Sequence, residues 1–352
     1  MNYIDNKNIL ITGGTWSIGQ AVFFRILNDY NPAKITVFSR DEYKQYRLRS
    51  LISNHPRKNI VQFVIGDIRD AQSVERVVRG HQVIFHCSAL KHVPVSEENP
   101  EEFIKTNVNG ALNIKKAALD SKIEILVWVS TDKAVNPTNV MWFTKSLQEK
   151  IFSSNYLDGE CVTKFVNVRF GNVIDTKGSL FPILAHQIQN NLPLTITHTD
   201  MTRFFMTRSE AVDLIIESAI VGNSGDTVVR KMQSVRIAHL FKMFLAAYRQ
   251  PEDYPVKVIG IRIWERLHEY LVSYDELLRM HYSDDGKYLI IPPYLHSEIN
   301  QNIINDSLGK NENDSLYDFA SENEKYFFSD TEILERISVF QEDQAKKSKE
   351  II

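Results

Sequence analysis

Cysteine and long apolar runs are scarce in this sequence of 352 residues, and each shortage excludes a class of protein. The two cysteines, Cys87 and Cys161, cannot make a disulfide framework, and neither belongs to a CxxC pair. No apolar run reaches membrane-spanning length, and the N-terminal MNYIDNKN lacks the basic and apolar regions of a signal peptide. We therefore expect a soluble cytoplasmic protein in a reducing compartment, without membrane insertion.

An excess of charge of one sign is missing as well. The chain has 41 Lys and Arg against 44 Asp and Glu, a net charge of −3, which argues against nucleic acid or an anionic membrane as the main partner. Hydrophobic residues make up 43% and charged residues 24%, which excludes wholesale disorder and leaves room for one large or two modest domains.

Short β-branched runs alternate with helical patterns over the first half of the chain. Alternation of this kind, with apolar strands, is typical of a parallel sheet covered on both faces, so the predicted fold is α/β, a doubly wound Rossmann sheet. Strands are predicted at 8–12, 35–39, 60–65, 82–86, 125–130 and 162–168, and helices at 18–28, 71–79, 103–119, 209–220, 236–248 and 330–347.

The pattern loosens after residue 168, where prolines punctuate shorter elements. We expect a Rossmann domain at 1–175, a smaller substrate-side region at 176–295 that is interleaved with it in space, and a polar tail with a terminal helix at 296–352. The stretch 296–318 is rich in Asn, Asp and Ser and is predicted to be a loop.

The run ILITGGTWSIGQAVFFRIL has the pattern of a strand, a glycine-rich turn and a helix. Gly13, Gly14 and Gly19 stand where a dinucleotide-binding turn needs backbone without a Cβ, so that the pyrophosphate can rest on the N-terminus of the helix. An ordinary tight turn is the alternative. The other predicted cofactor contacts of this turn are Thr15, Ser17 and Ile18.

Two further strand ends carry candidate cofactor contacts. Ser39 and Arg40 place a hydroxyl and a guanidinium where a 2′-phosphate would lie, so NADP is predicted in preference to NAD; a solvated charged loop is the alternative. Asp67 is a candidate acceptor for the adenine amino group, with Ile68 packed on the ring. A role of Asp67 as a helix N-cap fits the spacing equally well.

Six further segments stand in an order and spacing that resemble one family. They are SALKHVPVSEENPEEFIKTNVNGA, VSTDKAVNPTNVMWFTK, VRFGNV, GSLFP, MTRFFM and IGIR followed by ERLHE. Over residues 8–280 the chain looks like an inverting UDP-N-acetylglucosamine 4,6-dehydratase, an extended short-chain dehydrogenase/reductase of capsule, O-antigen and flagellin-sugar pathways. The resemblance implies UDP-N-acetylglucosamine as substrate, a homo-oligomer (dimer or hexamer), and binding of the nucleotide sugar by region 176–295.

The same resemblance implies the catalytic residues. Thr131 would hydrogen-bond the C4 oxygen of the sugar, Asp132 would be the acid at C6 and Lys133 the base at C5. Lys145 lies one helical turn after Met141. At the position of Met141 relatives have a Tyr that acts as the base for the sugar hydroxyl, and the Lys lowers the pKa of that Tyr and holds the nicotinamide ribose. A thioether cannot exchange that proton, although some capsule-pathway relatives also carry Met there.

The remaining candidates are binding residues. Lys91 would face cofactor or substrate, and no metal is predicted, because the histidines make no ligand spacing with Cys or carboxylates. The other predicted contacts are Ala89 and Asn107 for the cofactor, and Asn172, Arg203, Arg262 and Glu265 for the nucleotide sugar.

Three tryptophans depart from the family pattern. Trp16, Trp142 and Trp264 stand where relatives have glycine, and an indole at position 16 is expected to fill pyrophosphate space or to demand a backbone that a Cβ resists. Trp128, inside a predicted strand, is expected to be packing. Three functions follow: the inverting dehydratase; a nucleotide-sugar 4-epimerase or retaining dehydratase; and a non-catalytic binding subunit, which Trp16, Met141, Trp142 and Trp264 would favour.

Glycine is the third shortage, with 14 of 352 residues, about 4%, against about 7% in typical proteins. A source that reads UGA as glycine would produce both this shortage and tryptophan written at glycine sites, and we favour this hypothesis over decay because the STDK core is intact. Mass spectrometry of the native protein should then find glycine at positions 16, 142 and 264; tryptophan masses there would refute it.

Overall fold

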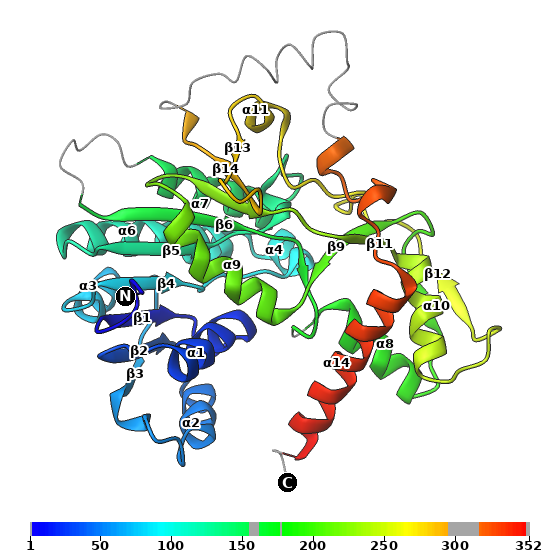
Figure 1. Cartoon of the computed structure of the whole chain (residues 1–352), viewed down its shortest axis with the longest axis horizontal. Helices are drawn as coiled ribbons and strands as arrows, with labels where there is room; N and C mark the ends of the chain where they lie inside the picture. The colour runs from blue at the N-terminus through cyan, green and yellow to red at the C-terminus, as the bar shows by residue number, and fades with distance from the viewer. Residues whose placement is uncertain (1, 155–161, 177, 295–316, 350–352) are drawn as a thin grey trace.

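The computed structural model describes residues 2–154, 162–176, 178–294 and 317–349, with side chains up to 345 at the C-terminal end. A nine-stranded sheet with the order β13-β14-β10-β6-β5-β4-β1-β2-β3 runs through the described part (Figure 1). Its first six strands by sequence are all parallel: β1 (Asn8–Thr12), β2 (Lys34–Ser39), β3 (Val61–Ile65), β4 (Val83–His86), β5 (Ile125–Val129) and β6 (Lys164–Arg169).

Strands from the second half of the chain extend the same sheet. β10 (Thr227–Arg230) pairs parallel to β6, and β14 (Tyr288–Ile291) and β13 (His281–Tyr282) follow in antiparallel pairing. The predicted doubly wound α/β sheet is confirmed. The order β3-β2-β1-β4-β5-β6 reverses direction between β1 and β4, and open α/β sheets bind ligands at such a point.

Helices cover both faces of the sheet because successive strand residues point to opposite sides. Ile9 and Ile11 pack with α1 (Ser17–Asp29) and α9 (Arg208–Val221), whereas Leu10 between them packs on the other side. α2 (Glu42–Leu51) joins the first face; α3 (Ala71–Val78), α6 (Gly110–Asp120) and α7 (Val140–Ser153) cover the second.

A second apolar core lies beside the sheet. It joins α8 (Leu180–Gln189), α10 (Ile237–Ala247) and the terminal helix α14 (Asp330–Lys349), which run side by side at the right of Figure 1. Short strands accompany these helices: β7 (Asn172–Val173), β8 (Leu194–Ile196), β9 (Thr202–Met206), β11 (Ser234–Arg236) and β12 (Val256–Val258). Between β12 and β13 lies the single-turn helix α11 (Tyr274–Leu277).

The predicted elements are found with small shifts at their ends, but one helix differs. The helix predicted at 103–119 is divided into α5 (Pro100–Phe103), a π-helical segment Ile104–Asn109 and α6. A further short helix, α4 (Val93–Glu98), precedes α5. Asn107 lies in the π-helical segment and is fully buried. The loop predicted at 296–318 lies outside the described residues up to 316, and Tyr317–Phe319 forms a 3₁₀ turn instead.

A buried cation ties three of these elements together. Arg169, at the end of β6 and 1% exposed, donates from Nε and one terminal nitrogen to Glu149 of α7, at 3.0 and 2.6 Å. It also donates to both oxygens of Glu276 in α11, at 2.7 Å each, and to the Leu271 carbonyl at 2.9 Å. All five guanidinium N–H groups are thus used, as a buried charge requires.

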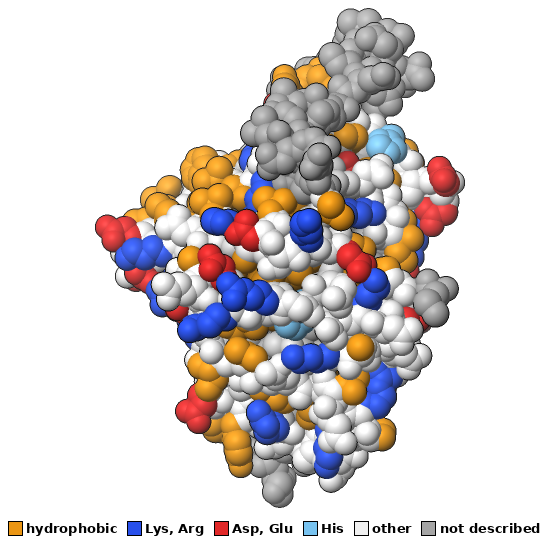
Figure 2. Space-filling view, turned by 90° about the vertical axis from the view of Figure 1, so that its left-hand side faces the viewer, with side chains coloured by type: hydrophobic (Ala, Val, Ile, Leu, Met, Phe, Trp, Pro, Cys, Tyr) orange, Lys and Arg blue, Asp and Glu red, His pale blue; other side chains and the backbone are white. Residues whose placement is uncertain are grey.

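The outer surface mixes charges of both signs. Figure 2 shows basic side chains spread over one face with acidic side chains among them, in agreement with the net charge of −3. None of the helices within the described residues combines the length and apolar character needed to cross a membrane.

We expect Arg169→Met to lower the free energy of unfolding by about 3–5 kcal/mol, because two carboxylates would stay buried without their cation. Urea denaturation measures this loss. Lys116→Met is the control, since it removes an ion pair with Asp120 in which both side chains are exposed, and little change is expected. An Arg169→Met protein as stable as the parent would contradict the role given to the buried cation.

Candidate active site

A cleft of about 440 Å³ opens at the carboxyl ends of β1, β4, β5 and β6. Each of these strand ends contributes a wall: the β1–α1 turn, the segment 87–92 after β4, the segment 129–133 after β5 and the segment 170–173 after β6. Met141 and Lys145 of α7 and the start of α8 close it. The predicted residues that it brings together are Ser17, Ile18, Gly19, Ala89, Lys91, Thr131, Lys133, Met141, Lys145 and Asn172.

The β1–α1 turn tolerates only glycine at two positions. Gly13 has φ +68°, and a Cβ there would lie 2.9 Å from the Cys87 carbonyl carbon; a Cβ on Gly19 would lie 2.5 Å from the Gly13 oxygen. The Thr15 hydroxyl is buried here without a hydrogen-bond partner in the described structure. The side chain of Trp16, the N-cap residue of α1, makes no capping hydrogen bond, and the N–H groups of a helix N-terminus can receive a phosphate. The turn therefore fits a dinucleotide pyrophosphate.

Trp16 fits this turn without strain. Its backbone is extended, with φ −97° and ψ 164°, and none of the three tryptophans at expected glycine positions has a positive φ. Of the two consequences expected of an indole at position 16, the strained backbone is therefore excluded, and the indole in pyrophosphate space remains the expectation. The indole of Trp16 is 46% exposed and lines the cleft, with the Lys44 ammonium 4.2 Å from the ring centre.

Two other tryptophans, Trp142 and Trp128, are buried in the core. Trp142 is buried beside Met141 and Phe103, and the Arg266 guanidinium lies 5.0 Å from its ring centre. Trp128 is fully buried in β5 and stacks on Phe152 with ring centres 5.7 Å apart, so its expected packing role is confirmed.

The predicted adenine end lies outside the lining of the cleft. Asp67 accepts from the Arg69 backbone N–H at 2.9 Å and from its guanidinium at 2.7 Å. Burial alone would raise the pKa of Asp67, but the hydrogen bonds from Arg69 and the Arg40 and Arg69 charges lower it. The N-cap of α3 is Asp70, so the alternative role of Asp67 as an N-cap is wrong.

The other residues predicted at the adenine end are Ser39, Arg40 and Ile68. The Ser39 hydroxyl accepts from the Gln45 amide at 3.0 Å, and Ile68 is buried. Arg40 lies half-exposed, 3.5 Å from the Asp67 carboxylate. The charged segment after β2 does not remain a loop, because Asp41 accepts from the Lys44 N–H and begins α2.

The sequence Thr131-Asp132-Lys133 follows β5 as an extended residue and a 3₁₀ turn. The Thr131 hydroxyl donates to Asp132 Oδ1 at 2.9 Å, and Lys133 Nζ lies 3.0 Å from the same oxygen. Lys133 Nζ also donates to Asn172 Oδ1 at 2.9 Å. Gly171 makes room for this turn, because a Cβ there would lie 2.7 Å from the Phe204 Cβ and 3.2 Å from Asp132 Oδ2.

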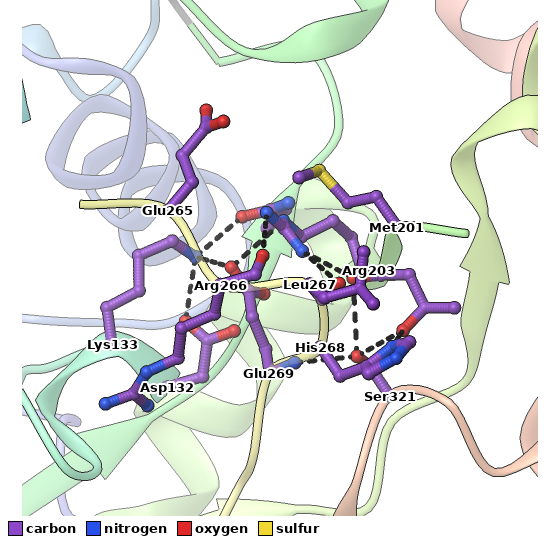
Figure 3. A network of polar contacts seen from close by, with 12 residues as sticks. Asp132, Lys133, Met201, Arg203, Glu265, Arg266, Leu267, His268, Glu269 and Ser321 are labelled. Carbon is purple, nitrogen blue, oxygen red and sulfur yellow. Dashed lines mark hydrogen bonds and ion pairs between the residues drawn. The ribbon is translucent and has the colours of Figure 1, made fainter. Parts of the chain in front are cut away.

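A second carboxylate reaches the same lysine. Glu269 Oε1 lies 3.0 Å from Lys133 Nζ and 3.1 Å from Arg203 Nε, so that two carboxylates and two cations form one cluster (Figure 3). Three residues of this cluster, Asp132, Lys133 and Arg203, were expected in the site from the sequence. The fourth, Glu269, was missed. Its only signal was its place in the segment ERLHE.

The cluster shifts the ionisation of its members. Burial, followed by the Glu269 charge, raises the pKa of Asp132 well above the usual carboxyl range. Burial alone would also raise the pKa of Glu269, but the Lys133 and Arg203 charges outweigh it and lower that pKa. Burial alone would lower the pKa of Lys133, yet the two carboxylates raise it. Lys133 is therefore an ammonium at neutral pH, and Asp132 can hold a proton there.

Lys145 approaches the cleft from α7. Its Nζ donates to the Val129 carbonyl at 3.1 Å and lies 4.8 Å from the Trp128 ring centre. Burial lowers its pKa to about 8. Met141, one turn earlier on the same helix and at the position where relatives are expected to have the tyrosine, is buried and lines the cleft. Lys91 also lines the cleft, and burial lowers its pKa.

Four predicted contacts have other surroundings. Asn107 is buried outside the cleft lining and clamps the backbone of Leu90, with its Oδ1 accepting at 2.8 Å and its Nδ2 donating at 3.1 Å. Arg203 donates to the Thr202, Arg266 and Leu267 carbonyls besides its pair with Glu269. Arg262 and Glu265 lie away from the cleft lining and approach one another at 3.5 Å.

No group of three or more His, Cys, Asp or Glu side chains that could hold a metal ion occurs among the described residues. Cys87 and His92 are further residues of the cleft that the sequence did not single out as contacts. Burial raises the pKa of the Cys87 thiol to about 12, so this thiol stays protonated.

We expect Gly19→Ala to weaken binding of the nicotinamide dinucleotide tenfold or more, because the added Cβ displaces the Gly13 carbonyl and with it the phosphate cradle. Isothermal calorimetry measures the affinity. Gly80→Ala is the control: nothing lies within 4 Å of its Cβ, but its φ of +78° makes it strained. It should lose stability and bind the dinucleotide normally. Equal affinity in both variants would refute the cradle.

Comparison with known proteins places these features in a family. The family model described as polysaccharide biosynthesis protein matches residues 9–291. A UDP-N-acetylglucosamine 4,6-dehydratase (inverting) of Campylobacter jejuni is 34% identical over 95% of this chain and 98% of that protein. A UDP-glucose 4-epimerase of Rickettsia bellii is 38% identical over 82% of this chain and 83% of that protein.

A solved structure is also similar to this chain. The X-ray structure of Pen from Bacillus thuringiensis superposes with a TM-score of 0.84 at 31% identity, and the match covers 96% of this chain and 99% of that one. The α/β fold is the one expected from the sequence. The chain belongs to the polysaccharide biosynthesis protein family, within the extended short-chain dehydrogenases/reductases.

Proposed function

We propose that the protein is an NADP-dependent UDP-N-acetylglucosamine 4,6-dehydratase that inverts C5 and yields a UDP-4-keto-6-deoxy-hexosamine for surface polysaccharide or glycan synthesis. The observation that carries the proposal is the Asp132–Lys133 pair, with 3.0 Å between Oδ1 and Nζ: Lys133 lines a cleft that also contains a dinucleotide turn, and Asp132 is buried beside it. Dehydration needs an acid and a base next to each other on one sugar, whereas hydride transfer alone does not.

The dinucleotide supplies hydride acceptance from C4 and hydride return to C6. Transfer of one proton from Lys133 Nζ to Asp132 converts the ion pair into a neutral amine and a neutral carboxylic acid. The amine then takes the C5 proton, while Asp132 gives its proton to the C6 oxygen, the C6–O bond breaks and water leaves. Return of a proton to the opposite face of C5 inverts that centre.

Oxidation at C4 also releases the hydroxyl proton, which Met141 cannot accept. We assign that proton to Lys145, whose pKa of about 8 leaves part of it neutral near physiological pH. Thr131, held through its hydroxyl by Asp132 at 2.9 Å, would orient the C4 oxygen. The reaction then balances: C4 and C5 release two protons, and the leaving water and C5 take up two.

NADP is preferred over NAD in this proposal because of Arg40. Its half-exposed guanidinium follows β2, where the adenine ribose of a Rossmann cofactor ends, and a 2′-phosphate is a strong bidentate partner for arginine. Ser39 and the buried Ile68 would contribute to the same end. Region 176–295 would hold the nucleotide sugar, with Arg262 and Glu265 reaching it from the loop that leads to Glu269.

A homo-oligomer, dimer or hexamer, is part of the proposal. Phe143 and Leu147 of α7 are 57% and 48% exposed, and Leu112 of the neighbouring α6 is 48% exposed, so these two helices present an apolar side to the outside.

The epimerase is the second candidate because of the Rickettsia bellii relative. Against it stands the Asp132–Lys133 pair, for which an epimerase has no use. A retaining dehydratase would use that pair with proton return to the same face of C5. A non-catalytic subunit would need the tryptophans to obstruct the site, yet Trp142 packs in the interior and Trp16 is unstrained at the cleft wall.

The test is incubation with UDP-N-acetylglucosamine and NADP in deuterated water, followed by NMR. The parent protein should form a 4-keto-6-deoxy sugar with deuterium at C5 and inverted configuration. Lys133→Ala should abolish the C5 exchange, because the proposed base is removed. The variant should still bind the UDP-sugar within about tenfold of the parent, because Lys133 contributes to the reaction rather than to substrate binding. Lys116→Ala, on the exposed side of α6, is the control and should react normally.

A triple Trp16→Gly, Trp142→Gly, Trp264→Gly variant separates the remaining alternatives. Product from the parent and the variant shows that the tryptophans are tolerated, and product from the variant alone shows that they block the site. Hydrogen exchange at C4 without loss of water would instead identify an epimerase, and full activity of Lys133→Ala would exclude Lys133 as the base.

A further inference from the structure

Glu269 is a second carboxylate that contacts Lys133, besides Asp132. Lys133 Nζ lies 3.0 Å from Glu269 Oε1, 3.0 Å from Asp132 Oδ1 and 2.9 Å from Asn172 Oδ1, so its three N–H donors have three partners. Figure 3 shows Lys133 and Glu269 joined by a dashed contact. Glu269 itself does not line the cleft, and its other oxygen is buried without a hydrogen-bond partner.

The position of Glu269 is set by two parts of the chain that are distant in sequence. Arg203 of β9 holds its carboxylate through Nε and holds the backbone of 266–267 through its terminal nitrogens. Ser321 holds its backbone: the Glu269 N–H donates to Ser321 Oγ at 2.8 Å, and the Ser321 N–H donates to the Glu269 carbonyl at 2.8 Å. Ser321 follows the end of the family match at residue 291.

Charged groups face this cluster from every element packed on it. The 3₁₀ turn brings Asp132 and Lys133, β9 brings Arg203, and Arg266 lies on the Glu269 segment with its guanidinium donating to the Val135 carbonyl at 2.9 Å. His268 points away from the cluster, toward Thr202 at 2.8 Å and Glu322 at 3.2 Å. Glu269 is thus the one carboxylate besides Asp132 that contacts Lys133 among the described residues.

We propose that Glu269 is a positioning residue of the dehydratase reaction, which fixes the number of protons shared by Asp132 and Lys133 and holds the Lys133 ammonium within transfer distance of Asp132. The inference rests on the proposed function, in which the pair works with one shared proton. A permanent negative charge beside both groups favours a proton on each of them. It keeps that pair from losing its last proton at neutral pH, so that one proton stays available to Lys133 and Asp132.

The sign of the effect follows from the charge. Glu269→Gln keeps the size of the side chain and removes the negative charge, so the pKa values of Asp132 and Lys133 should both fall. A charge at this distance shifts a pKa by about 1–3 units. Both limbs of the pH–rate profile should therefore move toward lower pH, and a variant that only loosened the site would lower the rate without moving either limb.

The decisive experiment needs no substrate. Infrared difference spectroscopy follows the protonated carboxyl of Asp132 against pH, and its band is assigned by its loss in Asp132→Asn. In the parent the midpoint should lie well above the usual carboxyl range. In Glu269→Gln it should fall by about one unit or more. Glu324→Gln removes an exposed carboxylate of the C-terminal segment and is the control, with an unchanged midpoint.

Each outcome decides the inference. An Asp132 midpoint that stays in place in a folded Glu269→Gln protein overturns it, and so does a parent midpoint in the ordinary carboxyl range, which is measured even if Glu269→Gln does not fold. The pH–rate profile with UDP-N-acetylglucosamine is recorded separately. A parent that titrates as expected but makes no 4-keto sugar refutes the proposed function and leaves the charge coupling of Glu269 established.

Discussion

The buried ion pair network around Arg169 is the constraint on which the site depends. Its guanidinium connects β6 to Glu149 of α7 and to Glu276 of α11, and Glu149 also accepts from the Ser130 hydroxyl at 2.6 Å. Ser130 directly precedes the segment Thr131–Lys133, and α7 carries Lys145. One buried cation therefore fixes the strand end and the helix against each other. Removing water from these charges is costly, so the network exists only where every donor and acceptor is matched.

The second charged cluster follows the opposite design. Around Arg169 every N–H is used, whereas around Lys133 one oxygen each of Asp132 and Glu269 is buried without a partner. Burial and the Glu269 charge raise the pKa of Asp132, which suits the acid role proposed for this carboxyl. The Arg169 network thus fixes the backbone around Lys133, where two carboxylate oxygens stay without hydrogen-bond partners.

Much of the fold was predictable because it depends on local pattern. Apolar strands alternating with helices require a covered parallel sheet, and the glycine turn follows from backbone geometry at positions such as Gly13 and Gly19. The π-helical interruption at Ile104–Asn109 was not predictable. It accompanies the two hydrogen bonds between the Asn107 side chain and the Leu90 backbone, which join segments that no local sequence pattern connects. The strain expected at Trp16 was wrong for a related reason: the chain meets the turn in an extended conformation there.

The amino-acid sequence by itself determined the fold class, the glycine turn and the placing of Thr131, Asp132 and Lys133 at a strand end, since these depend on neighbours along the chain. Only the tertiary structure decided what surrounds that triad. Glu269 is 136 residues beyond Lys133 and is brought to it by Arg203 and Ser321, from two other segments. Side-chain charges act through space, so the ionisation of a site depends on groups whose separation along the chain carries no information.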